Sequence, residues 1–327
     1  MKYFIIVILL FFLELLYFKV ATHLKIYDKP NERSSHKTLI LRGGGIIFLF
    51  GAILFFFYFG FQYPWFMLGL FVVALVSTWD DVHSLPDSVR LFVQFISVFL
   101  LFCQLGIIKW NLWWIVLPAW VICVGILSAY NFMDGINGIT GGYSLAVLLP
   151  LLYINARQEF IAMPLLICTV LADLVFCFFN YRRKARCFAG DVGAVSVAFI
   201  LVFAIGMLMV HTKDYSYIVF LAVYGVDTVL TIIHRILLHE NLGVAHRKHA
   251  YQILANELKI PHLFVSSFYM MLQLIVSAGL IWLPINHYVY AGIVLVLLSL
   301  VYVFFMKKYY HLHEEYLAQV EVRDCFS

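Results

Sequence analysis

Long apolar runs that carry almost no charge follow one another along the chain, and they constrain its fold more than any other feature. A transmembrane helix needs about 20 consecutive, predominantly apolar residues. Only helices and closed barrels satisfy their backbone groups in lipid, and the alternating segments of about 10 residues that a barrel shows are absent, so the runs predict helices. The runs lie at about residues 3–20, 44–60, 65–79, 89–108, 112–128, 140–155, 160–179, 194–211, 217–237, 262–283 and 288–306.

These runs predict an all-α integral membrane protein with ten or eleven transmembrane helices, folded as a single polytopic membrane domain over residues 1–327. The composition agrees, since 64% of the residues are hydrophobic and 12% are charged, against about 25% charged in a soluble domain. The first run lacks a small-residue cleavage site, so we interpret it as a retained span. The six cysteines are scattered, without the spacing of a zinc site or a disulfide framework.

The distribution of lysine and arginine predicts how the chain crosses the membrane, because these residues concentrate in cytoplasmic loops. With the N-terminus outside, 18 of the 22 lysines and arginines fall on the inner side and 4 on the outer side. We therefore expect an outer N-terminus, a cytoplasmic C-terminus and catalytic loops on the cytoplasmic face.

The first inner loop, residues 28–45, combines cations with backbone breakers. Asn31, Arg33 and His36 stand in the segment DKPNERSSHK, and Arg42 precedes three glycines. Cations and glycines could line an anion site, because glycine lets backbone N–H groups approach a phosphate. A positively charged tether that ends in a glycine turn explains the same residues, and on this loop alone we favour the tether.

Asp80 and Asp81 close the third apolar run, at a membrane boundary where a pair of carboxylates is costly unless it is solvated or used. Such a pair suits Mg²⁺, or divides into a metal ligand and a general base. A helix end that meets water explains the pair equally well.

The stretch 131–142, NFMDGINGITGG, is the most informative in the chain. Asn131, Asp134 and Asn137 recur at every third residue, which places them near one face of a helix. The glycines between them permit tight turns and close backbone approach. Such a dense polar cluster between two apolar spans is hard to explain by packing, so we favour a functional site over a simple turn.

Two later loops add cations to further polar residues. Asn180 begins a segment with four cations that ends in the turn Gly-Asp191-Val-Gly, and Asp191 is a candidate metal ligand. His246 and His249 stand in HRKHAYQ, 246–252, where phosphate contacts and a solvated basic loop are both open.

Two acids lie inside predicted spans. Asp173 and Asp227 are functional candidates by position, and a structural pairing is equally open for each.

Together these loops resemble the polyprenyl-phosphate N-acetylhexosamine-1-phosphate transferase family, glycosyltransferase family 4, and their motifs are most similar to the branch that initiates O-antigen and capsule synthesis. The resemblance covers about residues 28–252: DKPNERSSHK with the following GGG, the pair at 80–81, NFMDGINGI at 131–139, FAGDVG at 188–193 and HRKHAYQ at 246–252. The chain departs from the family pattern at Asn137, usually an acid, and at Ala194, usually a serine.

The resemblance also implies roles for individual residues. Catalytic roles are expected for Asp80, Asp81, Asp134, His246 and His249. Substrate contacts are expected for Asn31, Arg33, His36, Asn131, Asn137, Asn180 and Arg247. Metal binding is expected for Asp191 with Asp80 and Asp81, with Mg²⁺ as cofactor and Mn²⁺ as its substitute.

The implied activity is transfer of an N-acetylhexosamine-1-phosphate from a UDP-sugar to undecaprenyl phosphate, giving an undecaprenyl diphosphate sugar and UMP. This reaction would initiate cell-surface polysaccharide assembly, such as lipopolysaccharide O-antigen or capsule, in the bacterial inner membrane. We favour direct attack over a covalent intermediate, because the acceptor already carries anionic oxygens. Membrane lipid and a second copy in a homodimer are the other expected partners, and no nucleic acid is expected.

Two other functions stay open. A transporter or flippase of a lipid-linked or anionic solute would place polar groups near the membrane midplane, whereas here they gather at one boundary. An inactive family member is the second alternative, because of Asn137 and Ala194. We expect asparagine to suffice at position 137, by hydrogen bonding the donor or positioning the loop, so that Asn137→Asp stays active and Asn137→Ala is impaired.

Overall fold

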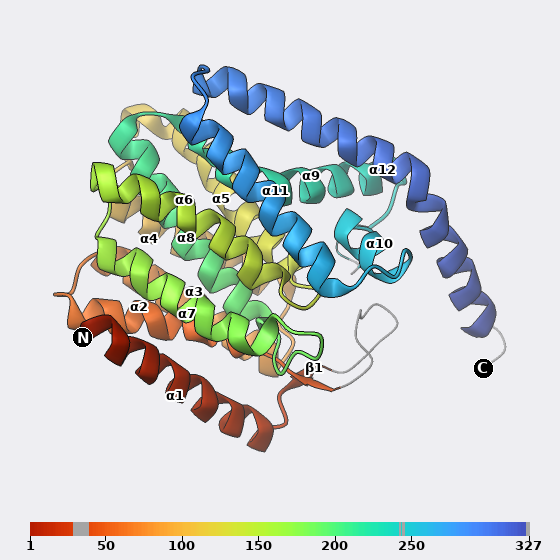
Figure 1. The fold of residues 1–327 in the computed structure, drawn as a ribbon, viewed down its shortest axis with the longest axis horizontal. Helices are drawn as coiled ribbons and strands as arrows, with labels where there is room; N and C mark the ends of the chain where they lie inside the picture. The colour runs from red at the N-terminus through yellow and green to blue at the C-terminus, as the bar shows by residue number, and fades with distance from the viewer. Residues whose placement is uncertain (29–38, 242, 244–245, 325–327) are drawn as a thin grey trace.

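The computed structural model describes residues 1–28, 39–241, 243 and 246–324, which are almost entirely helical (Figure 1). The α-helices are α1 (Lys2–His23), α2 (Ile47–Tyr58), α3 (Pro64–Val82), α4 (Asp87–Leu105), α5 (Trp113–Met133), α6 (Ile139–Gln158), α7 (Met163–Asn180), α8 (Gly190–Thr212), α9 (Ala222–Leu237), α10 (Ala250–Asn256), α11 (His262–Trp282) and α12 (His287–Asp324). Short 3-10 helices are η1 (Gly44–Ile46), η2 (Trp110–Leu112) and η3 (Tyr215–Leu221), and strands β1 (Tyr27–Asp28) and β2 (Ile40–Leu41) pair antiparallel.

Ten helices of the described chain are long and apolar enough to cross a membrane, which confirms the predicted all-α, multi-pass membrane fold. The remaining predicted span corresponds to the shorter apolar segment Gly44–Tyr58. This segment ends early because Gly60 adopts a positive φ and Pro64 starts the next helix.

Helix α8 forms the centre of the bundle. In its most apolar 18-residue stretch 83% of the residues are buried, compared with 28% for α1 and 22% for α12. A helix that is apolar on all sides is suited to such a central position. Phe66 of α3 stacks on Phe199 and Phe203 of α8, with ring centroids 5.7 and 4.2 Å apart, and this contact packs α3 tightly beside α8.

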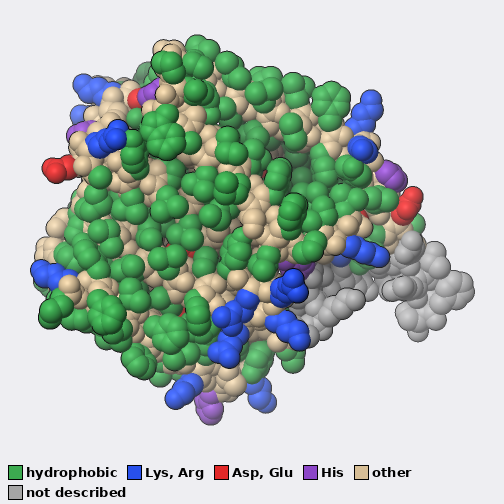
Figure 2. All heavy atoms as spheres, viewed as in Figure 1, with side chains coloured by type: hydrophobic (Ala, Val, Ile, Leu, Met, Phe, Trp, Pro, Cys, Tyr) green, Lys and Arg blue, Asp and Glu red, His purple; other side chains and the backbone are tan. Residues whose placement is uncertain are grey.

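The outer surface of the bundle is largely apolar. Figure 2 shows hydrophobic side chains over most of one face, with lysine and arginine at the lower centre and the right and a smaller group at the upper left. The same end of the bundle carries β1 and α10 in Figure 1, and we call it the polar end. The carboxyl ends of α3, α5 and α7 and the amino end of α8 meet there.

Helix α12 is much longer than a membrane span requires. Its 38 residues extend about 57 Å at about 1.5 Å per residue, against a hydrocarbon core of about 30 Å. The helix runs beside α9 and continues past α10 at the polar end (Figure 1).

Candidate active site

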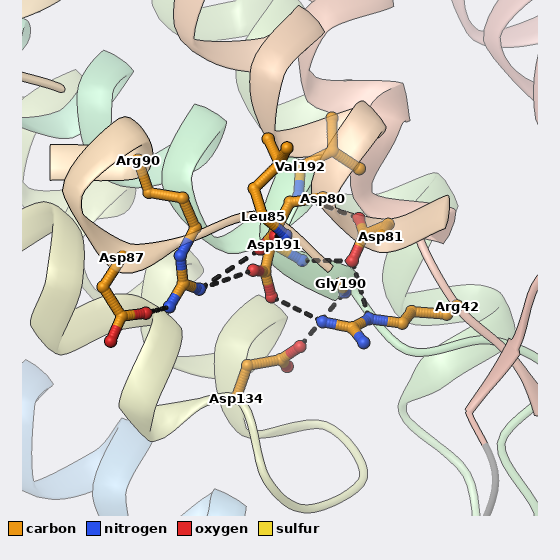
Figure 3. A network of polar contacts seen from close by, with 10 residues as sticks. All are labelled: Arg42, Asp80, Asp81, Leu85, Asp87, Arg90, Asp134, Gly190, Asp191 and Val192. Carbon is orange, nitrogen blue, oxygen red and sulfur yellow. Dashed lines mark hydrogen bonds and ion pairs between the residues drawn. The ribbon is translucent and has the colours of Figure 1, made fainter. Parts of the chain in front are cut away.

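Carboxyl groups from three distant segments meet at the polar end, with two arginines among them (Figure 3). Asp80 and Asp81 lie in the last turn of α3, Asp134 follows α5, and Asp191 lies in the first turn of α8. Four acids predicted from three separate motifs therefore form one cluster, which we call the acidic cluster.

Arg42 joins two of these carboxylates. The loop after β2 runs beside the segment before α8, where the Phe188 N–H donates to the Leu41 carbonyl at 2.8 Å. This pairing brings Arg42 Nε within 2.6 Å of Asp81 Oδ1 and Nη2 within 2.8 Å of Asp191 Oδ1. Burial alone would lower the pKa of Arg42, but the two carboxylates raise it above its usual value.

Arg90, near the start of α4, joins the cluster from the other side. Its Nη1 lies 3.2 Å from Asp80 Oδ2 and 3.2 Å from Asp191 Oδ2, and its Nη2 contacts Asp87. Asp80 also accepts a hydrogen bond from the Leu85 N–H at 2.6 Å, so the turn between α3 and α4 fixes its carboxylate. Asp191 thus lies between two guanidinium groups, with one on each oxygen.

Asp81 and Asp134 cover the amino end of α8. Asp81 accepts hydrogen bonds from the N–H groups of Asp191 at 2.9 Å and Val192 at 3.1 Å, and Asp134 accepts one from Gly190 at 3.2 Å. The first amides of a helix lack intrahelical partners and carry partial positive charge, so carboxylates are stabilised there. Gly190 has φ +70°, and a side chain there would lie 2.7 Å from Asp81 Oδ2, so the position requires glycine.

Asp134 is held by a second hydrogen bond, which its Oδ1 accepts from the Thr140 hydroxyl at 2.6 Å. Burial raises the pKa of Asp134 to about 6, while the hydrogen bonds from Thr140 and Gly190 act in the opposite direction. Asp134 therefore titrates much closer to neutral pH than an exposed aspartate does.

The glycine triplet of the first inner loop packs against α8. The N–H groups of Gly44 and Gly45 donate to the carbonyls of Phe188 and Ala189 at 2.9 and 3.0 Å. A side chain on Gly193 would lie 2.5 Å from the Gly45 Cα, so the two segments touch through glycine. Because these amides already have protein partners, the structure favours the glycine turn over a phosphate cradle.

Asn180, at the end of α7, links two of the predicted motifs. Its Oδ1 accepts a hydrogen bond from the Gly138 N–H at 2.8 Å, and its Nδ2 donates to the Cys187 carbonyl at 2.8 Å. The side chain is buried and bound on both sides, so it holds the two loops together. Its predicted substrate contact stays a prediction.

Asn137 also makes side-chain hydrogen bonds to another loop. Its Nδ2 donates to the carbonyls of Arg182 and Arg183 at 3.0 and 3.2 Å, and the residue is buried. Of the two tasks expected for this residue, the contacts support loop positioning, since the amide holds the cationic loop that precedes α8.

A groove of about 550 Å³ extends from Arg90 toward the loop 246–249, which we call the histidine loop. The polar residues that line it are Asp87, Arg90, Gln94, Ser128, Asn131, Arg235, His246 and His249. A water-sized cavity of about 10 Å³ reaches Asp191 and shares Arg90, Gln94 and Asn131 with the groove. Residues predicted from separate motifs therefore line one groove, next to the acidic cluster.

His249 is oriented by a buried carboxylate. Its Nδ1 lies 3.3 Å from Asp227 Oδ1, and its buried Nε2 has no hydrogen-bond partner among the described residues. Asp227 also accepts hydrogen bonds from the Ala250 N–H at 3.1 Å and the Tyr269 hydroxyl at 2.6 Å. Asp227 therefore fixes the ring of His249.

His246 and Arg247 lie in different surroundings. His246 lines the groove, and burial together with nearby His249 and Arg235 lowers its pKa to about 3, so it is neutral at physiological pH. Arg247 pairs instead with Glu257, with Nη2 2.9 Å from Oε1, and its predicted substrate contact stays a prediction. Three further predicted substrate residues lie outside the described residues: Asn31, Arg33 and His36.

The motifs alone do not assign Arg90 to the site. Arg90 is a lone arginine at the edge of an apolar run, ten residues after Asp80. A cation at such a position is costly unless it is paired, and this is the feature of the sequence that could have indicated its role. Asp227 carries the same kind of signal, but its spacing of 22 residues from His249 gives no sign of their contact.

The cluster offers suitable donors for a magnesium ion. Among the described residues, no group of three or more His, Cys, Asp or Glu side chains is placed to hold a metal alone. Mg²⁺ usually takes one or two carboxylates and completes its shell with water and substrate phosphates. Asp80 and Asp191, which Arg90 bridges beside the water-sized cavity, fit this mode of binding.

The fold and the site define a polytopic membrane protein with an arginine-flanked acidic cluster and a polar groove at one end of a helical bundle. Residues 63–211, which include Asp80 and Asp191, match the model of glycosyl transferase family 4. This match and the names of the similar proteins support the resemblance to the polyprenyl-phosphate hexosamine-1-phosphate transferases.

Similar proteins are known from several bacteria. A Bacillus subtilis protein named probable undecaprenyl-phosphate N-acetylglucosaminyl 1-phosphate transferase is 22% identical over 294 residues, 82% of each chain. The undecaprenyl-phosphate alpha-N-acetylglucosaminyl 1-phosphate transferase of Yersinia pestis is 28% identical over 200 residues, 55% of each chain. The phospho-N-acetylmuramoyl-pentapeptide-transferase of Thermotoga neapolitana is 30% identical over 121 residues, 37% of this chain and 38% of the relative.

Proposed function

We propose that this protein transfers an N-acetylhexosamine-1-phosphate, such as GlcNAc-1-phosphate, from a UDP-sugar to undecaprenyl phosphate. The names of the Bacillus and Yersinia relatives support this acceptor and this sugar phosphate. The observation that carries the proposal is a groove lined by Arg90, Asn131 and His249, next to the small cavity that reaches Asp191. A groove at this position can receive a water-soluble donor and a lipid-borne phosphate.

The reaction depends on positioning and on charge compensation more than on covalent chemistry. An oxygen of the lipid phosphate attacks the phosphorus next to the sugar, and the bond from that phosphorus to the UMP oxygen breaks. The attacking oxygen is already anionic, so no proton has to be removed and a direct displacement suffices. Arg90 lines the groove, and its planar guanidinium suits two-point contact with a phosphate.

We also propose a magnesium dependence, with Asp191 and Asp80 as the protein ligands. The four acids of the cluster and Asp87, which Arg90 also contacts, bring five carboxyl groups together with two guanidinium groups. When ionised the cluster is net negative, although both substrates are anions. Bound Mg²⁺ would offset this repulsion and the charge that develops on UMP, and Mn²⁺ would substitute for it.

The site is proposed to face the cytoplasm of the bacterial inner membrane, where UDP-sugars are made. Support comes from the sequence, in which 18 of the 22 lysines and arginines fall on the side that carries the cluster. The product would then initiate a surface polysaccharide such as O-antigen or capsule.

Purified protein supplied with UDP-GlcNAc, undecaprenyl phosphate and Mg²⁺ tests the proposal. We expect UMP release that requires both substrates. A transporter or flippase would bind or move the lipid without releasing UMP, and an inactive family member would not release it either. Asp191→Asn is the matched control, because it keeps the shape of the side chain and removes its charge.

A further inference from the structure

Arg247 and Lys248 of the histidine loop contact tyrosines of α12. Lys307 and the residues that follow it extend beyond the apolar part of α12, and we call residues 307–318 the terminal extension. Figure 1 shows α12 passing α10 before the chain ends. Neither the sequence motifs nor the chemistry described above assigns a task to this extension.

A buried carboxylate connects the extension to the histidine loop. Glu257, just after α10, has a side chain that is 3% exposed, and its Oε1 lies 2.9 Å from His313 Nδ1 and 2.9 Å from Arg247 Nη2. The guanidinium of Arg247 also lies 4.1 Å from the ring centre of Tyr316, which belongs to the extension. His313 is thus linked through one oxygen to a residue of the histidine loop.

Lys248, the next residue of the loop, also pairs with a carboxylate and lies near a tyrosine ring of α12. Lys248 Nζ contacts Glu240 and lies 5.8 Å from the ring centre of Tyr310. Arg247 and Lys248 therefore turn toward α12, while their neighbours His246 and His249 line the groove. Two cations of the loop therefore contact residues near or on α12, and its two histidines line the groove.

Buried ion pairs of this kind add little to the free energy of unfolding, because the cost of desolvating two charges offsets much of their attraction. Their geometry, however, is restrictive: a charged side chain that is nine-tenths buried has to keep its partner. An arrangement of this type fixes a position more than it adds stability.

We propose that the terminal extension of α12 positions the histidine loop, with His313 acting through Glu257 and Arg247 to keep His249 in the wall of the groove. His313 is a positioning residue, since it contacts Glu257 and does not line the groove. The inference rests on the proposed function, because the loop is assumed to serve the transfer reaction.

Three variants of the full chain test this inference. His313→Ala should lower kcat by about tenfold or more with little change in KM for UDP-GlcNAc, since small misplacements of a reacting group are costly. His313→Asn should recover most of the activity, because its amide Nδ2 can donate in place of Nδ1. His311→Ala is the matched control, a histidine exposed on the same helix, and should behave as the parent does.

A double-mutant cycle separates positioning from general destabilisation. In a His249→Ala background, His313→Ala should cause less than about a twofold further loss, because coupled residues are not additive. An equal loss in both backgrounds would overturn the inference, as would full activity of His313→Ala. If His313→Ala does not fold, Tyr316→Leu replaces it in the cycle. If the parent and His311→Ala release no UMP, the proposed function fails instead.

Discussion

The backbone N–H of Asp191 donates a hydrogen bond to the carboxylate of Asp81 at 2.9 Å, across 110 residues of sequence. The Val192 N–H donates a second one, and Arg42 pairs with the same carboxylate, whose side chain is 2% exposed. Asp80 is instead linked to Asp191 by Arg90, whose Nη1 contacts both carboxylates. The two adjacent aspartates therefore have different surroundings: Asp81 caps α8, and Asp80 binds Arg90 and the turn after α3.

Asp81→Asn is expected to lower both stability and activity. Asparagine keeps one acceptor oxygen and places an NH₂ group against a donor of α8 or Arg42. A buried donor left without a partner costs about 1–3 kcal/mol, so we expect a clear fall in the melting temperature of the purified protein and a loss of turnover. Glu159→Gln, exposed at the far end of α6, is the control and should melt as the parent does. An unchanged melting temperature for Asp81→Asn would refute its role as a cap.

Asn137→Asp is expected to be more harmful than Asn137→Ala, which reverses the expectation from the sequence. The Nδ2 of Asn137 donates to two backbone carbonyls, and a carboxylate there would place negative charge against both oxygens. Alanine only removes the donor, at a cost of about 1–3 kcal/mol. Melting temperature and kcat/KM of the two variants give the order. A fully active, stable Asp variant would show that these hydrogen bonds do not hold the loop.

The raised pKa of Asp134 predicts a pH dependence. Burial raises this pKa from 3.8 to about 6, so the folded protein holds the proton more tightly than the unfolded chain. The resulting stability is present in full below pH 3.8 and is lost as the pH rises through about 6. Melting temperatures between pH 4 and pH 7 should therefore show the parent losing stability relative to Asp134→Asn as the pH rises. Parallel curves for the two proteins would contradict the shift.

Asp191→Asn should abolish most of the activity and change its magnesium dependence. The substitution removes the charge that pairs with Arg42 and Arg90 and, in our proposal, with Mg²⁺. We expect turnover at saturating Mg²⁺ to fall by at least about 10²-fold, the scale of losing a major electrostatic contributor. For the parent, EDTA should stop the reaction and added Mg²⁺ should restore it. Near-normal turnover of the variant would exclude Asp191 as the metal ligand.

The apolar runs predicted nearly all of the fold, because a span in lipid must be helical and about 20 residues long. The acids of the cluster were predicted together only through the family resemblance, because a helix end that meets water explains Asp80 and Asp81 equally well. The partners of these acids could not be predicted: nothing in the spacing connects Arg90 to Asp191, or His313 to Glu257. For the same reason Asn137 could not be assigned to hold backbone carbonyls, because its partners come from another loop.

The position of one labelled phosphorus atom in the products shows whether a sugar phosphate is transferred. In UDP-GlcNAc labelled with ³²P at the β-phosphate, the labelled phosphorus is the one attached to the sugar. Transfer of a sugar phosphate to undecaprenyl phosphate should therefore place the ³²P in the organic-extractable lipid and leave unlabelled UMP, and Asp191→Asn should lose this transfer. Label that stays in water-soluble UDP while the sugar enters the lipid, or that never reaches the lipid at all, would contradict the proposed transfer.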